Sequence, residues 1–256
     1  MVFDNVVKAF ENTGGAPGYT LAIENVSFAI REREVVSLVG PSGCGKSTSL
    51  GLIAGLILPS AGEVLVDGEP VTGCSKRIGY MLQKDLLLPW RTSLENIEFG
   101  LEIQGMPASE RHVRAQGLMA KYGLGGFEQR YPHQLSGGMR QRVALARTLA
   151  LDPEILLLDE PFSALDYQTK LLMQQDLLNV LRDVNKTVLF ITHDIQEAVC
   201  LSDRVLLMSK RPGMIKAEFT IDLPEEQSLV DLRSSPRANE YFQQIWKELE
   251  HDVHIG

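Results

Sequence analysis

The chain has 256 residues, 44% of them hydrophobic, and a formal net charge of −8. Its length and composition are sufficient for a globular protein with a buried core, in one large or two small domains. The negative charge argues against nucleic acid as a general partner. The longest apolar stretch, residues 51–58, is far shorter than the roughly 18 residues that span a bilayer, so we expect a cytoplasmic location.

The first third of the chain reads mainly as β-structure. Apolar residues alternate with polar ones within residues 1–33, which predicts antiparallel strands around a loop at residues 11–18. A short helix is predicted over residues 49–54, where Gly55 would end it. Asp67-Gly68 is typical of a hairpin turn. Further strands are predicted over residues 34–39, 63–66 and 77–82.

The segment between strand 34–39 and the helix has the form G-x-x-x-x-G-K-[ST]. Its glycines let successive N–H groups point inward, and it opens a helix N-terminus, which favours anions. Lys46 is expected to reach the β- and γ-phosphates of a nucleotide, and the Ser47 hydroxyl to bind Mg²⁺. The flanking strand and helix support a P-loop. The residues predicted to bind ATP here are Gly40, Pro41, Ser42, Gly43, Cys44, Gly45, Lys46, Ser47 and Thr48.

Helices dominate from Gln83 onwards. Thr92-Ser93-Leu94-Glu95 is a capping box that opens a helix running to Gln104. Other helices are predicted over residues 109–122, 139–151, 168–184 and 195–200. Strands are predicted over residues 155–158, 187–191, 204–208 and 215–221. Strands that alternate with helices around a P-loop predict a parallel sheet covered on both faces.

A second motif is the apolar strand 155–158 followed by two carboxylates, Asp159 and Glu160. In P-loop enzymes an acidic residue at the end of a neighbouring strand holds Mg²⁺, which predicts this role for Asp159. Glu160 can then accept a proton from, or orient, the water that attacks the γ-phosphate. The alternative is that the pair only begins a solvated loop.

The third motif is Leu135-Ser136-Gly137-Gly138-Met139. Its serine and glycines before a helix make a second amide-rich anion site, which one chain rarely needs for one nucleotide. Its natural use is on the γ-phosphate of a nucleotide held by a second copy of the protein. A glycine-rich helix cap is the alternative explanation.

Together these motifs resemble the ATP-binding cassette (ABC) ATPases, the nucleotide-binding subunits of ABC transporters. The resemblance covers about residues 3–222 and implies ATP and Mg²⁺ as cofactors and an ATP-dependent homodimer. It implies that Gln83 contacts Mg²⁺ and the attacking water, that His193 contacts the γ-phosphate, and that residues 163–166 form a D-loop at the dimer interface. The residues implied to bind the partner's ATP are Gln134, Ser136, Gly137, Gly138 and Asp166.

The implied fold class is α/β, a P-loop NTPase with a RecA-like parallel sheet core, an antiparallel β-subdomain and an inserted helical subdomain. Accordingly, residues 1–84 are expected to hold the β-subdomain and the P-loop, and residues 85–153 the helical subdomain. Residues 154–222 would complete the core, and residues 223–256, with an amphipathic stretch near 241–246, would form a C-terminal tail. For the aromatic side chain that stacks on adenine, Phe10 is the first choice and Tyr19 the rival.

Three features resemble those of importer ATPases for nitrate, sulfonate, taurine and related solutes. They are the string Leu-Pro-Trp at residues 88–90, the string Arg211-Pro212-Gly213 and the short C-terminal tail. This branch implies integral-membrane permease subunits, with Trp90 as a contact, and indirectly a solute-binding protein. It also implies a peripheral position on the cytoplasmic side of the membrane. The alternatives are a soluble ABC ATPase not coupled to transport, which would be expected to carry two cassettes or a coiled-coil insertion, and a P-loop kinase, which would lack residues 135–139.

Overall fold

A computed structural model describes residues 1–12, 18–163, 165–184, 186–224 and 227–253. Most of the predicted loop at residues 11–18 and Ala164 of the predicted D-loop therefore lie outside the described residues. The chain forms two compact units. The first comprises residues 1–75 and 184–256, and the second comprises residues 76–183.

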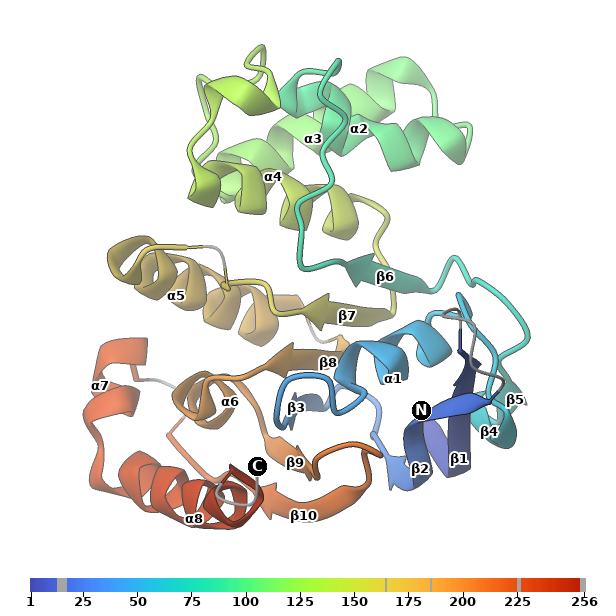
Figure 1. Ribbon diagram of the computed structural model, residues 1–256. Helices are drawn as coiled ribbons and strands as arrows, with labels where there is room; N and C mark the ends of the chain where they lie inside the picture. The colour runs from blue at the N-terminus through green and yellow to red at the C-terminus, as the bar shows by residue number, and fades with distance from the viewer. Residues whose placement is uncertain (13–17, 164, 185, 225–226, 254–256) are drawn as a thin grey trace. The chain divides into compact units, whose positions relative to one another are not determined.

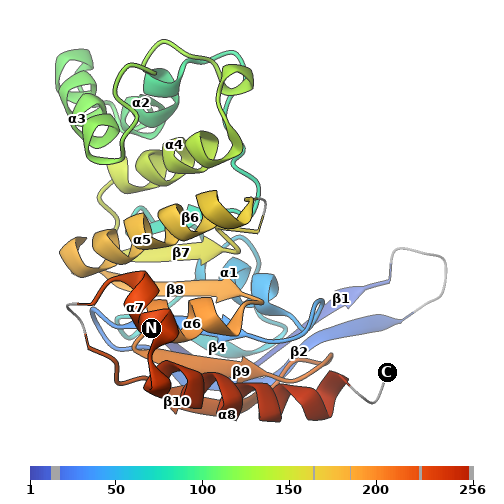
Figure 2. The same cartoon turned by 90° about the vertical axis from the view of Figure 1, so that its left-hand side faces the viewer.

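The first unit contains an antiparallel sheet with the strand order β2-β1-β4-β5. Its strands are β1 (Val2–Glu11), β2 (Tyr19–Ala29), β4 (Ala61–Val66) and β5 (Glu69–Pro70). The antiparallel pairing of β1 with β2 confirms the prediction for the N-terminal residues, and the two strands form a long hairpin (Figure 2). Phe3 and Phe28 stack across this pair with ring centroids 4.5 Å apart.

The same unit contains strands in the order β10-β9-β3-β8. They are β3 (Val35–Val39), β8 (Thr187–Thr192), β9 (Arg204–Met208) and β10 (Ile215–Thr220). β3 is parallel to both β8 and β9, and every residue of β8 and β9 is buried, as their continuous apolar sequence predicts for a covered parallel sheet. β10 is antiparallel to β9 and alternates between partly buried and exposed residues.

The described residues of this unit also form the helices α1 (Lys46–Ile53), α6 (Ile195–Leu201), α7 (Leu229–Ser234) and α8 (Pro236–Val253). The prediction that the first helix begins at residue 49 is wrong by one turn, since Gly45 already acts as its N-cap in a left-handed conformation. The C-terminal residues fold into α7 and α8, which lie beside α6 (Figure 2).

The second unit contains the parallel pair β6 (Ile78–Met81) and β7 (Ile155–Asp159). Its helices α2 (Ser93–Ile103), α3 (Ala108–Lys121) and α4 (Gly137–Ala150) pack on one another (Figure 1). The unit also holds the 3₁₀ turn Pro132–Gln134 and α5 (Tyr167–Val184). The predicted capping box is confirmed, because Thr92 Oγ1 accepts a hydrogen bond from Glu95 N and Glu95 Oε2 accepts one from Thr92 N.

Within the described residues, no helix is both long enough and apolar enough to cross a bilayer.

Candidate functional site

The P-loop joins β3 to α1 in the first unit and packs tightly against β2. Gly45 has φ +106°, and a Cβ added to it would lie 2.4 Å from Ile23 Cγ2 and 3.0 Å from the carbonyl oxygen of Ala22. A side chain at Gly45 would therefore displace the loop from β2. The glycine lets the backbone turn directly into α1, so that Lys46, Ser47 and Thr48 form its first turn.

Lys46 is almost fully buried, with 6% of its surface exposed. Its Nζ donates hydrogen bonds to the carbonyl oxygens of Gly40, at 2.7 Å, and Pro41, at 2.9 Å. The ammonium group is thus held inside the curve of the loop, where its charge favours phosphate oxygens. Burial raises the pKa of the neighbouring Cys44 thiol, although Lys46 opposes this shift, and the reactive thiolate form is therefore disfavoured.

The two adjacent carboxylates end β7 in the second unit. Asp159 is 7% exposed and accepts a hydrogen bond from Tyr80 Oη at 3.4 Å. Burial, and then the negative charge of Asp159, raise the pKa of the Tyr80 phenol, which keeps it a neutral donor. The hydrogen bond from Tyr80 thus helps to fix the Asp159 side chain at the end of the strand.

Glu160 follows with φ +44°, a conformation that costs energy for a residue with a side chain. Gln83 Nε2 donates to Glu160 Oε2 at 3.2 Å and to Ser163 Oγ at 3.4 Å. Ser163 Oγ in turn donates to the carbonyl oxygen of Glu160 at 3.1 Å. The structure therefore brings Gln83 and Glu160, two predicted catalytic residues, into direct contact.

The glycine motif forms the N-terminus of α4. Ser136 is its N-cap, and Ser136 Oγ accepts a hydrogen bond from Met139 N at 3.3 Å, so the helix begins at residue 137 and not at the predicted residue 139. A Cβ at Gly138 would lie 2.5 Å from Thr169 Cγ2, whereas a Cβ at Gly137 would meet no atom closer than 3.8 Å. Gly138 is thus needed for packing, whereas the space beside the Cα of Gly137 is open, at a helix N-terminus that favours anions.

Two other residues implied to bind the partner's ATP make local contacts. Gln134 Oε1 accepts a hydrogen bond from Tyr131 N at 2.9 Å. Asp166 Oδ1 accepts one from Thr169 N at 3.1 Å, and hydrogen bonds from the side chain and then the backbone of Thr169 lower the pKa of the carboxyl group. Asp166 therefore caps the start of α5, a function that its position before that helix could have indicated.

His193 is exposed between β8 and α6 in the first unit. Its neighbours are fixed on both sides. Asp194 N donates to Thr192 Oγ1 at 3.0 Å, and Asp194 Oδ1 accepts from Gln196 N at 2.9 Å as the N-cap of α6. The backbone that presents the imidazole is thus held by side chains of the adjoining strand and helix.

The two candidates for adenine stacking lie near the end of the β1–β2 hairpin. Phe10 is 39% exposed and pairs with Thr20, and Lys8 Nζ lies 5.1 Å from its ring centroid. Tyr19 is 72% exposed on the facing strand, opposite Glu11. Both rings are available to a ligand, so the choice between them stays a prediction.

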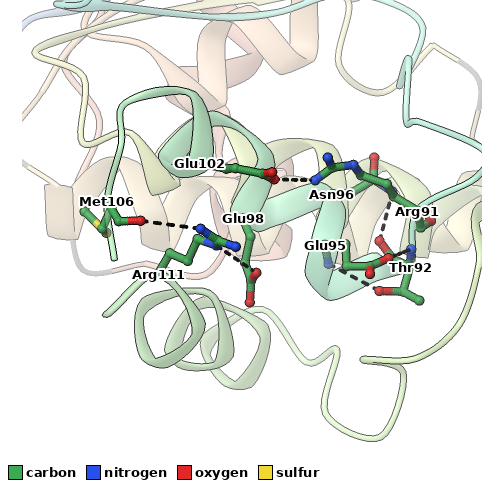
Figure 3. A network of polar contacts seen from close by, with 8 residues as sticks. All are labelled: Arg91, Thr92, Glu95, Asn96, Glu98, Glu102, Met106 and Arg111. Atoms are coloured by element: carbon green, nitrogen blue, oxygen red, sulfur yellow. Dashed lines mark hydrogen bonds and ion pairs between the residues drawn. The ribbon is translucent and has the colours of Figure 1, made fainter. Parts of the chain in front are cut away.

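The loop that carries Trp90 is held rigidly in the second unit. Asn96, fully buried in α2, donates to the carbonyl oxygens of Leu88, Arg91 and Thr92 at 2.9–3.2 Å. Asn96 Oδ1 also accepts from Leu88 N at 2.8 Å. Trp90 itself is 70% exposed. Figure 3 shows Asn96 with Arg91 and Thr92, and beside them the ion pair between Arg91 Nη1 and Glu102 Oε2, which are 2.6 Å apart.

Replacing Asn96 by alanine should lower the free energy of unfolding by about 1–3 kcal/mol, because several buried backbone groups would lose their partner. Urea denaturation measures this change. Glu102→Gln in the same helix is the matched control and should change stability much less, since Glu102 lies at the surface. Equal effects of the two substitutions would contradict the anchoring role of Asn96.

Sequence reasoning missed Asn96 and two arginines of α4. Arg147 donates to the carbonyl oxygens of Leu86 and Asp85 at 2.8 and 2.6 Å, and Arg140 Nε donates to Asp85 Oδ2 at 3.1 Å. Burial lowers the pKa of Arg147, which remains charged. The signal that could have indicated these contacts was a polar residue among the apolar positions of each helix. These contacts border a pocket of about 680 Å³ lined by Gln83, Lys84, Asp85, Leu86, Leu87, Gln141 and Ser163.

Comparisons with known proteins agree on one family. A family model described as "ABC transporter" matches residues 23–163. An uncharacterised ABC transporter ATP-binding protein of Methanocaldococcus jannaschii is 46% identical over 98% of this chain and 91% of its own length. The taurine import ATP-binding protein TauB of Yersinia pestis is 49% identical over 78% of this chain and 79% of its own length.

A solved structure, the dimeric ATP-binding cassette MJ0796 in a post-hydrolysis state with ADP and Pi, has a TM-score of 0.76. It is 35% identical, and the match covers 87% of this chain and 99% of that cassette. The predicted fold class is confirmed by this likeness.

Proposed function

The chain belongs to the ABC transporter family as an ATP-hydrolysing, ATP-binding subunit, and we propose that it powers uptake of a small solute through a separate membrane permease. The solute class is nitrate, a sulfonate such as taurine, or a related compound. The observation that carries this proposal is the 49% identity to a taurine import ATP-binding protein. The exposed Trp90 on a loop of fixed conformation also supports it.

Two copies of the chain close head to tail on ATP. Lys46 and the amides of the P-loop bind the phosphates of one ATP, and Ser136, Gly137 and Gly138 of the other copy bind its γ-phosphate. Gln134 and Asp166 act at the same interface, and an aromatic ring, Phe10 or Tyr19, stacks on adenine. The open space beside Gly137 at the start of α4 supports this arrangement, because a helix N-terminus favours anions.

Mg²⁺ is the metal that fits the residues assigned to it. The hydroxyl of Ser47, the amide oxygen of Gln83 and the carboxylate of Asp159 are hard oxygen donors, which this ion prefers, and when bound it neutralises charge on the phosphates. Glu160 accepts a proton from the attacking water, Gln83 holds the Glu160 carboxylate in place, and His193 contacts the γ-phosphate.

The subunit works at the cytoplasmic side of the membrane as a peripheral protein, and a solute-binding protein delivers the solute to the permease. Helices of the permease dock at Trp90 and at the 680 Å³ pocket, whose lining includes Leu86 and Leu87. Reconstitution in liposomes with the permease encoded beside this chain tests the proposal. ATP-driven solute uptake is the expected result, whereas hydrolysis that never couples to any such permease would favour a soluble ABC ATPase.

Replacing Trp90 by alanine should weaken binding to that permease by about 30-fold, the effect of losing an aromatic hot spot of about 2 kcal/mol. ATP hydrolysis by the isolated subunit should be unchanged. Ile103→Ala is the matched control, because Ile103 is equally exposed, at 71%, on the same unit. Permease binding that is equally tight for both variants would contradict the proposed contact of Trp90 with the permease.

A further inference from the structure

The C-terminal helices α7 and α8 belong to the core of the first unit. Ala238 and Ile245 of α8 are 5% and 0% exposed. They share one apolar cluster with Ile195 of α6 and with Val39, the residue that precedes the P-loop. The last part of the chain therefore packs beneath elements that carry candidate site residues (Figure 2).

Arg233 of α7 connects these helices to the start of α6. Its Nη2 donates a hydrogen bond to Gln196 Oε1 at 2.9 Å and lies 3.8 Å from Asp194 Oδ2. Both charged side chains are largely shielded from solvent, with exposed fractions of 14% for Arg233 and 25% for Asp194. An ion pair in such surroundings is less screened than one at the surface.

The two carboxylate oxygens of Asp194 have different partners. Oδ1 caps α6 by accepting hydrogen bonds from Gln196 N and Glu197 N, at 2.9 and 3.3 Å, while Oδ2 faces Arg233. On the other side, Thr192 Oγ1 donates to the buried carboxylate of Glu197. His193 is the residue between Thr192 and Asp194, so its backbone lies between two anchored neighbours.

We propose that Arg233 is a positioning residue for ATP hydrolysis, which orients the His193 loop by holding Asp194 and Gln196 at the start of α6. This inference rests on the role proposed above for His193. It gives the C-terminal helices a function in the reaction, since they supply the cation that fixes the loop. Misplacing a reacting group by about 1 Å can reduce the rate by up to about 10²-fold.

Arg233→Ala in the full-length chain should therefore lower kcat for ATP by roughly 10-fold. The KM for ATP should not change, because the P-loop contacts remain. Arg233→Lys keeps the charge and should recover part of the rate. The matched control is Arg237→Ala, since Arg237 pairs at the surface with Asp222 and both side chains are more than half exposed; this variant should hydrolyse ATP at the wild-type rate.

A spectroscopic measurement separates positioning from a general loss of structure. The chain has five histidines, so the imidazole C2–H resonance of His193 can be assigned by NMR with a His193→Gln variant. This resonance should shift in Arg233→Ala and stay in place in Arg237→Ala. Thermal unfolding is recorded for each variant, and Gln196→Ala, which removes the acceptor of the same hydrogen bond, replaces Arg233→Ala if that variant does not fold.

A kcat for Arg233→Ala equal to that of Arg237→Ala would overturn the inference, as would a lower kcat with an unchanged His193 resonance. His193→Ala distinguishes this failure from that of the underlying proposal. If His193→Ala is inactive while Arg233→Ala has wild-type turnover, only the positioning role is refuted. If His193→Ala has wild-type turnover, the catalytic role of His193 is itself refuted.

Discussion

Replacing Glu160 by glutamine should reduce ATP hydrolysis by about 10²–10⁴-fold while ATP binding persists, because an amide cannot accept the proton of the attacking water. The variant keeps an oxygen that can accept the hydrogen bond of Gln83, so the geometry at the end of β7 is preserved. Phosphate release at saturating ATP measures the rate, and calorimetry measures the binding.

The matched control for this change is Glu154→Gln. Glu154 lies just before the same strand and forms a half-exposed ion pair with Arg77. Its substitution should leave hydrolysis unchanged. Wild-type turnover by Glu160→Gln would show that another group accepts the proton.

Lys46→Ala is expected to weaken ATP binding by roughly 10- to 100-fold, which corresponds to the loss of a charged hydrogen-bond donor worth about 1.5–3 kcal/mol. The ammonium group lies inside the curve of the P-loop, bonded to the carbonyl oxygens of Gly40 and Pro41, and no other lysine belongs to the loop. Calorimetric titration with ATP measures the affinity of the folded variant.

Lys247→Ala provides the control for charge, because Lys247 is an exposed lysine of α8 in the same unit. Its affinity for ATP should equal that of the wild type. An unchanged affinity in Lys46→Ala would refute the assignment of the P-loop as the phosphate site.

Much of the fold could be predicted because its signals are local. The alternating pattern of β1 and β2, the buried runs of β3, β8 and β9, and the capping box at Thr92 each depend on residues close in sequence. The same holds for the P-loop, whose glycines encode the turn into α1. Their spacing, however, did not indicate that the helix already begins at Lys46, because that depends on the conformation of Gly45.

The supporting contacts could not be predicted, since they join side chains whose proximity depends on packing. Arg233 donates a hydrogen bond to Gln196, which lies 37 residues earlier in the sequence. Arg147 of α4 donates hydrogen bonds to the loop carbonyl oxygens of Asp85 and Leu86. The left-handed conformation of Glu160 could not be predicted from a sequence pattern either, because residues with a side chain adopt it only rarely. These are features of tertiary structure that single-sequence periodicity does not contain.

If each ATP site needs two subunits, two variants that each lack a different half of the site can be used to test this. Lys46→Ala disables the P-loop but leaves the glycine motif intact. Gly137→Asp does the reverse: its side chain has room beside Arg140 and Leu165, yet it places a carboxylate where a phosphate is expected. Each variant alone should hydrolyse ATP far more slowly than the wild type.

Mixing these two variants tests the central claim most directly. A head-to-tail dimer of one subunit of each kind contains one site built from an intact P-loop and an intact glycine motif. ATP hydrolysis by the mixture should therefore exceed the sum of the rates of the separate variants. A mixture no faster than that sum would contradict the account, because it would mean that the P-loop and the glycine motif do not complete a site between subunits.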